Sequence, residues 1–408
     1  MHPDGPTGGH SLLCTITRTM SIIGILGGGH LARMTTQAAQ RLGALVAVLD
    51  KDENSPAAQV TALAVDGDWN DFELVSEFAQ SCDVVSPESE DVPVEVLERL
   101  EREGRVVRPS SRTIAATRDR LVQKQLLRDA GMPTAPFADA PTLEAVREFA
   151  ATYAYPVVLK TRTGGRDGRA NALVRSAGML KQEFEQLHAR GPLMVEAYQN
   201  FLREFAVVGV RGQDGQVRVY DTAVTRCVQN ILQAVSVPAP DNFARYLAEN
   251  GRKNGALYLT DVPALVERLA QLIDVIGAFG VELFELRDGS VVINDVTPRP
   301  HFSGHWTIEG ATTSQFENHA RALLGWPLGW TDMIVPHAAV AALLARTDAL
   351  PKAADFVQAA QLRGAHFHWY GKAHSYRTRR LGHVTGLAAT DPEAERIAQM
   401  TVVALLGW

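Results

Sequence analysis

The sequence has little cysteine: Cys14, Cys82 and Cys227 are its three thiols in 408 residues. Their spacing matches no metal-binding pattern and suggests no disulfide framework, so we expect a protein of the reducing cytoplasm. Long apolar runs are also missing, because none reaches the roughly 18 residues that indicate a membrane-spanning helix. The net charge is only −6, which argues against nucleic acid or an anionic membrane as the main partner.

The composition that remains is that of a globular protein, with 46% hydrophobic and 21% charged residues. The length suffices for roughly two or three domains with buried cores. Residues 1–19 are rich in Gly, Pro, Ser and Thr and lack the long apolar core of a secretory signal. We expect this segment to be a flexible tail outside the fold.

From Met20 onward, short apolar runs alternate with amphipathic runs, the pattern of a parallel sheet with crossover helices. Strands are expected at residues 45–50, 63–68, 82–88 and, as a short fifth strand, 105–110. Amphipathic periodicity predicts helices over residues 30–43 and 92–104, each ending on a glycine. The pattern therefore predicts an α/β domain.

A glycine cluster follows the first apolar run in "SIIGILGGGHLARM", residues 21–34. We expect a strand, a sharp turn at Gly27 and Gly29, and a helix whose first N–H groups face the space above the turn. The spacing G-x-G-x-x-A, with Asp50 about 20 residues further on, fits the dinucleotide fingerprint. A nicotinamide-dependent oxidoreductase is therefore one alternative.

The second half of the chain has longer strands and more turns. A helix is expected within residues 111–130, closed by Gly131 and Pro133. The run "YPVVLKTRTGGRDGRANALV" predicts a hairpin that carries Lys160 and Arg169 near a glycine-rich tip. Further predictions are an antiparallel meander over residues 193–224, a hairpin over 281–301, strands at 366–372 and 382–389, and a final helix from about residue 392.

Two of these hairpins have residues suited to phosphate and metal. A lysine beside a glycine-rich tip can neutralise phosphate oxygens while backbone N–H groups approach closely, although a solvated hairpin is the alternative. Glu282 and Asp295, with Asn294, lie on the two strands of the later hairpin and can share a hard cation such as Mg²⁺. The apolar setting of Glu282 in "FGVELFEL" favours a site, because a buried carboxylate needs a partner.

The stretch "RPHFSGHWTIEGATTSQFENH" is dense in polar, aromatic and histidine side chains, a composition that suits a binding loop. His301 and His305 have a spacing that can bind zinc, but neither a cysteine nor a third nearby histidine supports such a site.

Together these motifs resemble the ATP-grasp superfamily and, within it, the 5-(carboxyamino)imidazole ribonucleotide synthases, enzymes of purine biosynthesis. The resemblance runs from Met20 to the C-terminus. The matching motifs occur in the family's order: "GILGGGHLARM", "RDRLVQKQLL", "VVLKTRTGGRDGRAN", "PRPHFSGHWTIEGATTSQFENHARALLGWPLG" and "YGK…RRLGHVT".

The resemblance implies an α/β ATP-grasp architecture, an ADP-forming ligase, and the substrates ATP, bicarbonate and an amine nucleotide. It also implies Mg²⁺ or Mn²⁺ as the metal, carboxyphosphate as the intermediate, and a homodimer. The expected divisions are a tail (1–19), a pre-ATP-grasp α/β domain (20–118), a lid subdomain (119–200), the ATP-grasp catalytic domain (201–335) and a C-terminal subdomain (336–408).

Matching motifs also imply the site residues, and they place the opening glycine turn at the amine substrate. The implied catalytic residues are Arg299, His301 and Asp167. The implied ATP contacts are Arg120, Lys160, Gly165, Arg166, Asp167, Gly168, Arg169, Asn171, Glu196, Ala197, Tyr198, Gln199, Glu204, Cys227 and Asn294. The implied amine-substrate contacts are Gly29, His30, Glu88, Ser303, Lys372, Arg379 and Arg380. The implied metal ligands are Glu282 and Asp295.

Eight departures from the family pattern fall inside these motifs: His30 for Gln, Ala32 for Gly, Asp91 for Asn, Arg166 for Tyr, Ala170 for Gly, Cys227 for His, Asp295 for Glu and Phe302 for Asn. The exchanges at 30 and 302 remove two amides beside the expected imidazole position, and a pocket without such partners discriminates differently. Three hypotheses stay open: the purine-pathway ligase, a paralogue that acts on another amine in specialised metabolism, and a nucleotide-binding protein without turnover.

Overall fold

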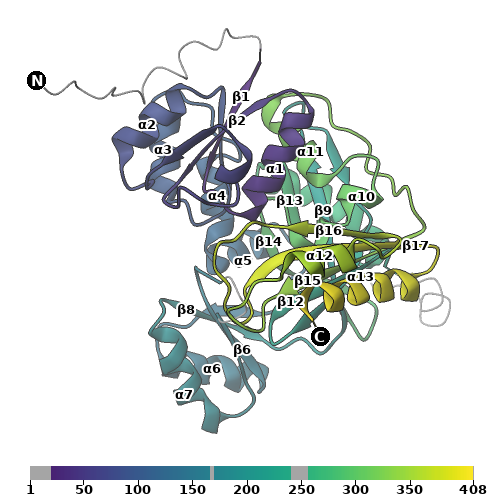
Figure 1. Ribbon diagram of the computed structural model, residues 1–408. Helices are drawn as coiled ribbons and strands as arrows, with labels where there is room; N and C mark the ends of the chain where they lie inside the picture. The colour runs from purple at the N-terminus through teal and green to yellow at the C-terminus, as the bar shows by residue number, and fades with distance from the viewer. Residues whose placement is uncertain (1–19, 166–169, 240–255, 408) are drawn as a thin grey trace, which may run out of the picture.

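The computed structural model describes residues 20–165, 170–239 and 256–407. Within these ranges the chain forms three β-sheets with helices packed around them (Figure 1). The expected tail at residues 1–19 lies outside the described residues, as do residues 166–169 of the glycine-rich loop. No helix in the described part of the chain has the length and apolarity to cross a membrane.

The first sheet is parallel, with the strand order β3-β2-β1-β4, which confirms the predicted α/β start. Its strands are β1 (Ile22–Leu26), β2 (Leu45–Asp50), β3 (Leu63–Asp66) and β4 (Val84–Pro87). The expected fifth strand at residues 105–110 is wrong, since that segment contributes an isolated bridge between Val85 and Val107. Pro109 has no N–H group with which to extend the pairing.

Three amphipathic helices cover this sheet and bury their apolar faces against it: α1 (His30–Arg41), α2 (Phe72–Gln80) and α3 (Val94–Arg102). A short 3₁₀ helix, η1 (Ala58–Val60), follows β2. On one face Leu26 and Leu49 pack with Phe78. On the other face Ile23 and Val46 pack with Leu323, which comes from the distant helix α11 (Gln315–Leu324).

The single helix expected within residues 111–130 is wrong, because the structure has two helices, α4 (Ser111–Arg118) and α5 (Arg120–Asp129). Asp119 separates them in an extended conformation, and its carboxylate accepts hydrogen bonds from the N–H groups of Leu121 and Val122. It also pairs with the guanidinium of Arg162 at 2.7 Å. An aspartate is a favoured N-cap residue, and here it fixes the start of α5.

The second sheet, called the small sheet, has the antiparallel order β5-β8-β6-β7. Its strands are β5 (Phe137–Asp139), β6 (Val157–Thr161), β7 (Asn171–Val174) and β8 (Leu193–Ala197). Helices α6 (Leu143–Tyr153) and α7 (Ala177–His188) pack on it with their own core (Figure 1). The predicted hairpin is confirmed, with Lys160 opposite Asn171.

The large sheet has nine strands in the described residues, in the order β14-β13-β9-β11-β12-β15-β17-β16, with β10 on β9. They are β9 (Phe201–Arg211), β10 (Val217–Val219), β11 (Ala223–Val228), β12 (Ile231–Val237), β13 (Gly277–Leu286), β14 (Val291–Thr297), β15 (His337–Leu344), β16 (Ala365–Trp369) and β17 (Arg380–Ala388). The single meander expected over residues 193–224 is wrong, because β8 belongs to the small sheet.

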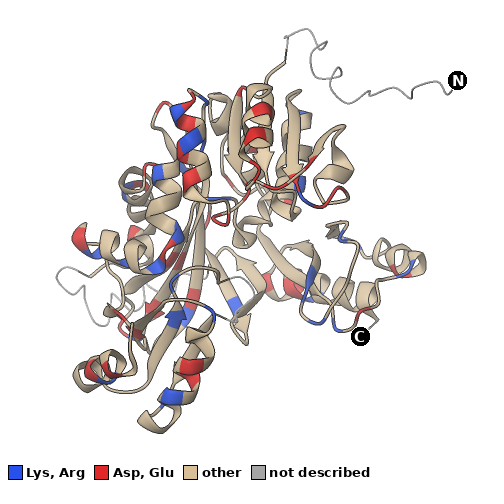
Figure 2. Cartoon of the chain, turned by 90° about the vertical axis from the view of Figure 1, so that its left-hand side faces the viewer, with Lys and Arg blue, Asp and Glu red and all other residues tan. Residues whose placement is uncertain are grey.

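The large sheet is covered by α9 (Val262–Leu272), α10 (Thr307–Gly310), α11, α12 (Ala353–Ala359) and α13 (Asp391–Leu406), with the 3₁₀ turns η3 (Leu259–Asp261) and η4 (Phe302–Gly304). The C-terminal strands and the final helix were predicted. The strands extend this sheet through the β12–β15 pair, and α13 packs against β15 and β17. Acidic and basic side chains are interspersed on the outer helices (Figure 2). The division into four folded domains stays a prediction.

Candidate active site

Three adjoining cavities lie where the N-terminal, small and large sheets meet. The central cavity, of about 480 Å³, has Lys160 and Asp295 in its wall. The side cavity, of about 310 Å³, extends past Glu204. The basic cavity, of about 510 Å³, extends to Arg380. Glu282 lines all three, so the cavities adjoin at its side chain.

The β13–β14 hairpin brings two carboxylates together, as predicted. Glu282 and Asp295 are direct antiparallel partners, and the register shifts immediately after Glu282. Such partners project from the same face of a sheet. The side-chain amide of Asn294 donates to Glu282 Oε2 at 3.2 Å.

The pKa values of the two carboxyl groups are shifted in opposite directions. Burial alone would raise the pKa of Glu282, but the hydrogen bond and charge of His301, with Lys160, outweigh burial and lower that pKa. Burial raises the pKa of Asp295 against the opposing charge of Arg120, and the charge of Glu282 raises it further. Two adjacent carboxylates whose ionised forms repel are suited to a shared cation. Among the described residues, no three His, Cys, Asp or Glu side chains gather to hold a metal alone.

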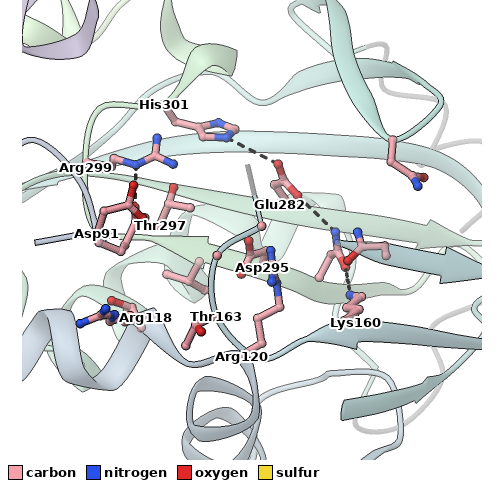
Figure 3. Close-up of a pocket in the computed structure, with 18 residues that line it drawn as sticks. Asp91, Arg118, Arg120, Lys160, Thr163, Glu282, Asp295, Thr297, Arg299 and His301 are labelled. Atoms are coloured by element: carbon pink, nitrogen blue, oxygen red, sulfur yellow. Dashed lines mark hydrogen bonds and ion pairs between the residues drawn. The ribbon is translucent and has the colours of Figure 1, made fainter. Parts of the chain in front are cut away.

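Lys160 connects the small sheet to this hairpin. Its Nζ lies 2.6 Å from Glu196 Oε2 and donates to Asn294 Oδ1 at 3.1 Å. In Figure 3, Glu282 lies between His301 and the Lys160 side of the cavity. The glycine-loop hairpin and the acidic hairpin therefore face each other across one cavity.

Arg120 and Gly165 meet at the entrance of the small-sheet loop. Arg120 is the first residue of α5, and its guanidinium donates to the Thr161 carbonyl at 2.8 Å. A Cβ at position 165 would overlap that guanidinium, so glycine lets the loop pass close to a positive charge. The other predicted loop residues, Arg166, Asp167, Gly168 and Arg169, lie outside the described residues.

His301 and Arg299 stand where the central and basic cavities join. The N–H of Ser303 lies 3.4 Å from His301 Nδ1, and the other ring nitrogen, Nε2, lies 3.5 Å from Glu282 Oε1. Arg299 Nε donates to Glu90 Oε2 at 3.0 Å. Burial opposes the charge of Arg299, but Glu90, with Glu88 and Asp295, raises its pKa.

The side cavity follows the segment between β8 and β9. Glu196, Ala197, Tyr198 and Gln199, the four predicted residues of this segment, all line it. Further along, the thiol of Cys227 donates to Glu204, and burial raises the pKa of that carboxyl. The cavity is lined by both apolar side chains, such as Leu283, and polar ones, such as Glu204.

The opening glycine turn lies at the edge of the basic cavity. The N–H of Gly28 donates to Asp50 at 2.6 Å, and the N–H groups of Gly29 and Ala32 donate to Glu88 at 2.9 and 3.3 Å. These amides at the start of α1 are therefore occupied by carboxylates of the chain itself. A dinucleotide pyrophosphate needs such amides, so the nicotinamide alternative is wrong.

The far wall of the basic cavity is positively charged. Lys372, Arg379 and Arg380, three of the predicted substrate contacts, line it. Arg380 donates to the Leu232 carbonyl at 2.8 Å, and its guanidinium carbon lies 3.9 Å from the centre of the Phe302 ring. Phe302 is 4% exposed and supports this arginine by a cation–π contact.

His30 lies between the glycine turn and this basic wall. Its ring stacks on Tyr370 with the centres 4.5 Å apart. Burial, followed by the charge of Lys372, lowers the pKa of His30 well below its ordinary value, so the ring is neutral near pH 7. His305 and His383 are buried beneath it, and no metal cluster forms from these histidines in the described ranges.

Two residues predicted to contact the amine substrate, Ser303 and Glu88, interact with other residues of the chain. Ser303 is 2% exposed and lies behind His301, where the Ser303 hydroxyl is 2.8 Å from Nδ1 of the ring. Glu88 lines the basic cavity but also caps the start of α1. Both residues therefore act on the cavity partly through their neighbours.

Three residues at the site escaped the sequence reasoning: Lys124, Glu90 and Asn230. Lys124 lies in the quoted motif "RDRLVQKQLL", where its place on the buried face of α5 was the available signal. Glu90 lies two residues after Glu88, at the carboxyl end of a parallel strand. Asn230, at the β11–β12 turn, lines all three cavities but carried no local signal.

Three family models match consecutive parts of the chain. The ribonucleotide synthetase preATP-grasp domain matches residues 20–118, and the ATP-grasp domain matches residues 125–316. The phosphoribosylaminoimidazole carboxylase C-terminal domain matches residues 338–397. The order of the three matches is the order of the predicted architecture.

Curated relatives and solved structures agree with this assignment. The chain is 34% identical to the N5-carboxyaminoimidazole ribonucleotide synthase of Synechococcus elongatus, over 92% of each chain. It is 33% identical to the phosphoribosylaminoimidazole carboxylase of Schizosaccharomyces pombe, where 93% of this chain covers 67% of that protein.

A solved structure adds the spatial comparison. The N5-carboxyaminoimidazole synthase of Aspergillus clavatus, in complex with ADP and 5-aminoimidazole ribonucleotide, matches with a TM-score of 0.81 and 31% identity, covering 95% of this chain and 98% of that one. This agreement in sequence, order of domains and fold establishes the family. The chain belongs to the N5-carboxyaminoimidazole ribonucleotide synthase family of ATP-grasp ligases.

Proposed function

We propose that this chain converts 5-aminoimidazole ribonucleotide and bicarbonate to 5-(carboxyamino)imidazole ribonucleotide with cleavage of ATP to ADP and phosphate. Family membership supports this reaction, as does the Aspergillus clavatus relative that was solved with ADP and the same ribonucleotide. The observation that carries the proposal is the position of Lys160 opposite Glu282 and Asp295, in a cavity that opens into a basic one.

The chemistry divides into two transfers. A bicarbonate oxygen attacks the γ-phosphorus of ATP, which releases ADP and forms carboxyphosphate. The amine nitrogen of the ribonucleotide then attacks the carboxyphosphate carbon, the C–O bond to phosphate breaks, and the amine loses a proton. Phosphoryl transfer of this kind depends mainly on positioning and on charge stabilisation.

The central and side cavities would hold ATP. Lys160 and Arg120 supply positive charge for the phosphoryl oxygens, and Glu204 faces the ribose. The backbone of Glu196–Gln199 borders the adenine slot. Asn171 and Asn294 lie in the wall that both cavities share.

Mg²⁺ fits the acidic hairpin. Glu282, Asp295 and the Asn294 amide are oxygen donors of the type that Mg²⁺ prefers, and a site with so few protein ligands is completed by substrate phosphates. When bound, the metal supplies charge neutralisation between the phosphates. The side chains of this hairpin orient that charge, and His301 Nε2 holds Glu282 in place.

The basic cavity would hold the amine nucleotide. Lys372, Arg379 and Arg380 suit its 5′-phosphate, because charge-assisted contacts to phosphate are strong. Arg299 and His301 lie at the junction, where the amine must meet the activated carboxyl group. We infer the homodimer and the cytoplasmic location from the resemblance alone.

A different amine is the second candidate, and two contacts favour it. Phe302 packs beneath Arg380, and His30 stacks on Tyr370, so two positions beside the base carry rings in place of amides. Rings select a base by stacking, whereas amides select it by paired hydrogen bonds.

The test is ADP release with ATP, Mg²⁺, bicarbonate and 5-aminoimidazole ribonucleotide, with each of the last two omitted in turn. Carbon-13 bicarbonate lets the new carbamate carbon be followed by NMR in the same reaction. ADP release and a carbamate signal that require both components support the proposal. ADP release that needs another amine supports the paralogue, and nucleotide binding without turnover on any amine contradicts both.

A further inference from the structure

Lys124 is a lysine that the proposed reaction does not use, yet it lies beside the nucleotide cavity. It is 2% exposed on α5 and is absent from the walls of the three cavities in the described part of the chain. Its Nζ lies 3.3 Å from Glu196 Oε1. The other oxygen of the same carboxylate, Oε2, lies 2.6 Å from Lys160 Nζ. One buried carboxylate is therefore shared by two lysines.

The surroundings of Lys124 indicate its charged form. Its Nζ donates to Thr134 Oγ1 at 2.7 Å and to the Ile293 carbonyl at 2.9 Å. The Thr134 hydroxyl can itself donate to the Ile293 carbonyl, which leaves its oxygen to accept from Lys124. With two neutral oxygen acceptors and the Glu196 carboxylate in ion-pair contact, the surroundings of Nζ suit an ammonium ion.

Because Lys124 and Lys160 share the Glu196 carboxylate, the net positive charge beside the nucleotide cavity depends on Lys124. A lysine and a glutamate alone at 2.6 Å form a neutral pair, whose attraction for a phosphate is small. With Lys124 included, the three side chains carry a net charge of +1. Because Lys124 and Glu196 are buried behind Lys160, that charge acts on the cavity through the Lys160 ammonium.

We propose that Lys124 is a positioning residue for nucleotide binding, which neutralises Glu196 so that Lys160 presents its positive charge to the phosphates. The inference rests on the proposed function, because it assumes that Lys160 contacts ATP. It adds a residue and a mechanism that the motif match did not supply. The small sheet, α5 and the acidic hairpin are joined at this one trio.

The experiment compares the affinities of ATP and adenosine by calorimetry in the full chain. We expect Lys124→Met to weaken ATP binding by about tenfold or more, because a net charge is lost beside the phosphates. Adenosine, which has no phosphate, should keep its affinity within about twofold. Lys124→Arg should bind ATP like the unmodified chain. Lys181→Met, at an exposed lysine that pairs with Glu185, is the matched control.

The decisive variant is the double substitution Lys124→Met with Glu196→Gln. It restores the net charge of the trio to +1, so ATP affinity should recover to near that of the unmodified chain. Equal losses for ATP and adenosine, or an unchanged ATP affinity in Lys124→Met, would overturn the inference, as would a double variant no better than the single one. Lys160→Ala serves as the separate check: unchanged ATP binding in that variant contradicts the proposed function itself.

Discussion

Glu282 is the residue on which most of the site depends, because it lines all three cavities and contacts both His301 and Asn294. His301 approaches one of its oxygens at 3.5 Å, and Asn294 donates to the other at 3.2 Å. These contacts, with Lys160, lower its pKa and keep it ionised although it is surrounded by protein. A fixed negative charge at the meeting point of the cavities would help to hold a divalent cation.

Glu282→Gln should therefore lower ADP release by at least about 100-fold, since one carboxylate ligand is lost while the shape is kept. The Mg²⁺ concentration needed for half-maximal rate should rise as well. Steady-state ADP release measured over a series of Mg²⁺ concentrations tests both expectations.

Glu285→Gln on the same strand is the control. Glu285 pairs with Arg203 at 2.7 Å and does not line the three cavities in the described residues. It should lose some stability but keep turnover within about threefold, because a lost ion pair affects folding more than chemistry. Equal loss of turnover in the two variants would show that the metal assignment is mistaken.

Single residues also show what the sequence can reveal. The Glu282–Asp295 pair was predictable, because a carboxylate in an apolar strand must have a partner. For Lys124 only the position on the buried face of α5 was a local signal; its partners were not predictable, because they come from residues 134, 196 and 293. Pairing of side chains across distant segments leaves no local pattern.

Among the elements, helix α11 holds the start of strand β13. The N–H of Ala278 donates to His319 Nδ1 at 3.0 Å. Gly277, with φ of 115°, allows the strand to pass directly over that ring. Because Nδ1 accepts this hydrogen bond, the ring must be neutral for the contact to exist. Burial lowers the pKa of His319 to about 4, which keeps the ring neutral near pH 7.

Acid should therefore weaken the fold through this histidine. In the unfolded chain its pKa is about 6.5, so between pH 6.5 and 4 the unfolded state binds a proton that the folded state does not. The contribution to the free energy of unfolding is complete above pH 6.5 and falls by about 1.4 kcal/mol for each pH unit between pH 6.5 and 4. Urea unfolding at a series of pH values, compared with His319→Gln, measures that slope.

In His319→Gln the free energy of unfolding should depend less steeply on pH, by the equivalent of one bound proton. Glutamine offers an acceptor oxygen to the Ala278 N–H but does not titrate. His366→Gln, at an exposed position on β16, is the matched control. The difference between the parent and His319→Gln excludes the other buried histidines, which are common to both chains. Parallel pH profiles would contradict the role given to His319.

Element boundaries were predicted where the local signal was complete. The β13–β14 hairpin has alternating residues and a glycine turn, and both features are local. The break at Asp119 was missed because helical residues surround it on both sides, although aspartate is a common N-cap. The place of β8 was missed because strand pairing depends on the whole fold: β8 pairs with β5 and β6, whereas β9 follows after a few residues and joins another sheet.

The molecule as a whole has cores that do not coincide with its sheets. One core joins Ile23 and Val46 of the N-terminal sheet to Leu323 of α11, and the Arg108 guanidinium donates to the Leu323 carbonyl at 3.0 Å. The small sheet has a core of its own, which includes Leu180 of α7. The N-terminal sheet and the large sheet should therefore unfold together, while the small sheet can open separately.

Leu323→Ala and Leu180→Ala separate these two units, because each removes one leucine that is 1% exposed. Each cavity should cost about 2–5 kcal/mol. Native-state hydrogen exchange should report that loss in β1, β2, α11 and β13 together for Leu323→Ala, but within residues 137–197 for Leu180→Ala. A loss confined to the N-terminal sheet in Leu323→Ala would mean that the shared core does not couple the sheets. In that case the N-terminal sheet could move away from the large sheet while both hydrophobic cores stay intact, and the three active-site cavities, which need all three sheets in place, would be lost.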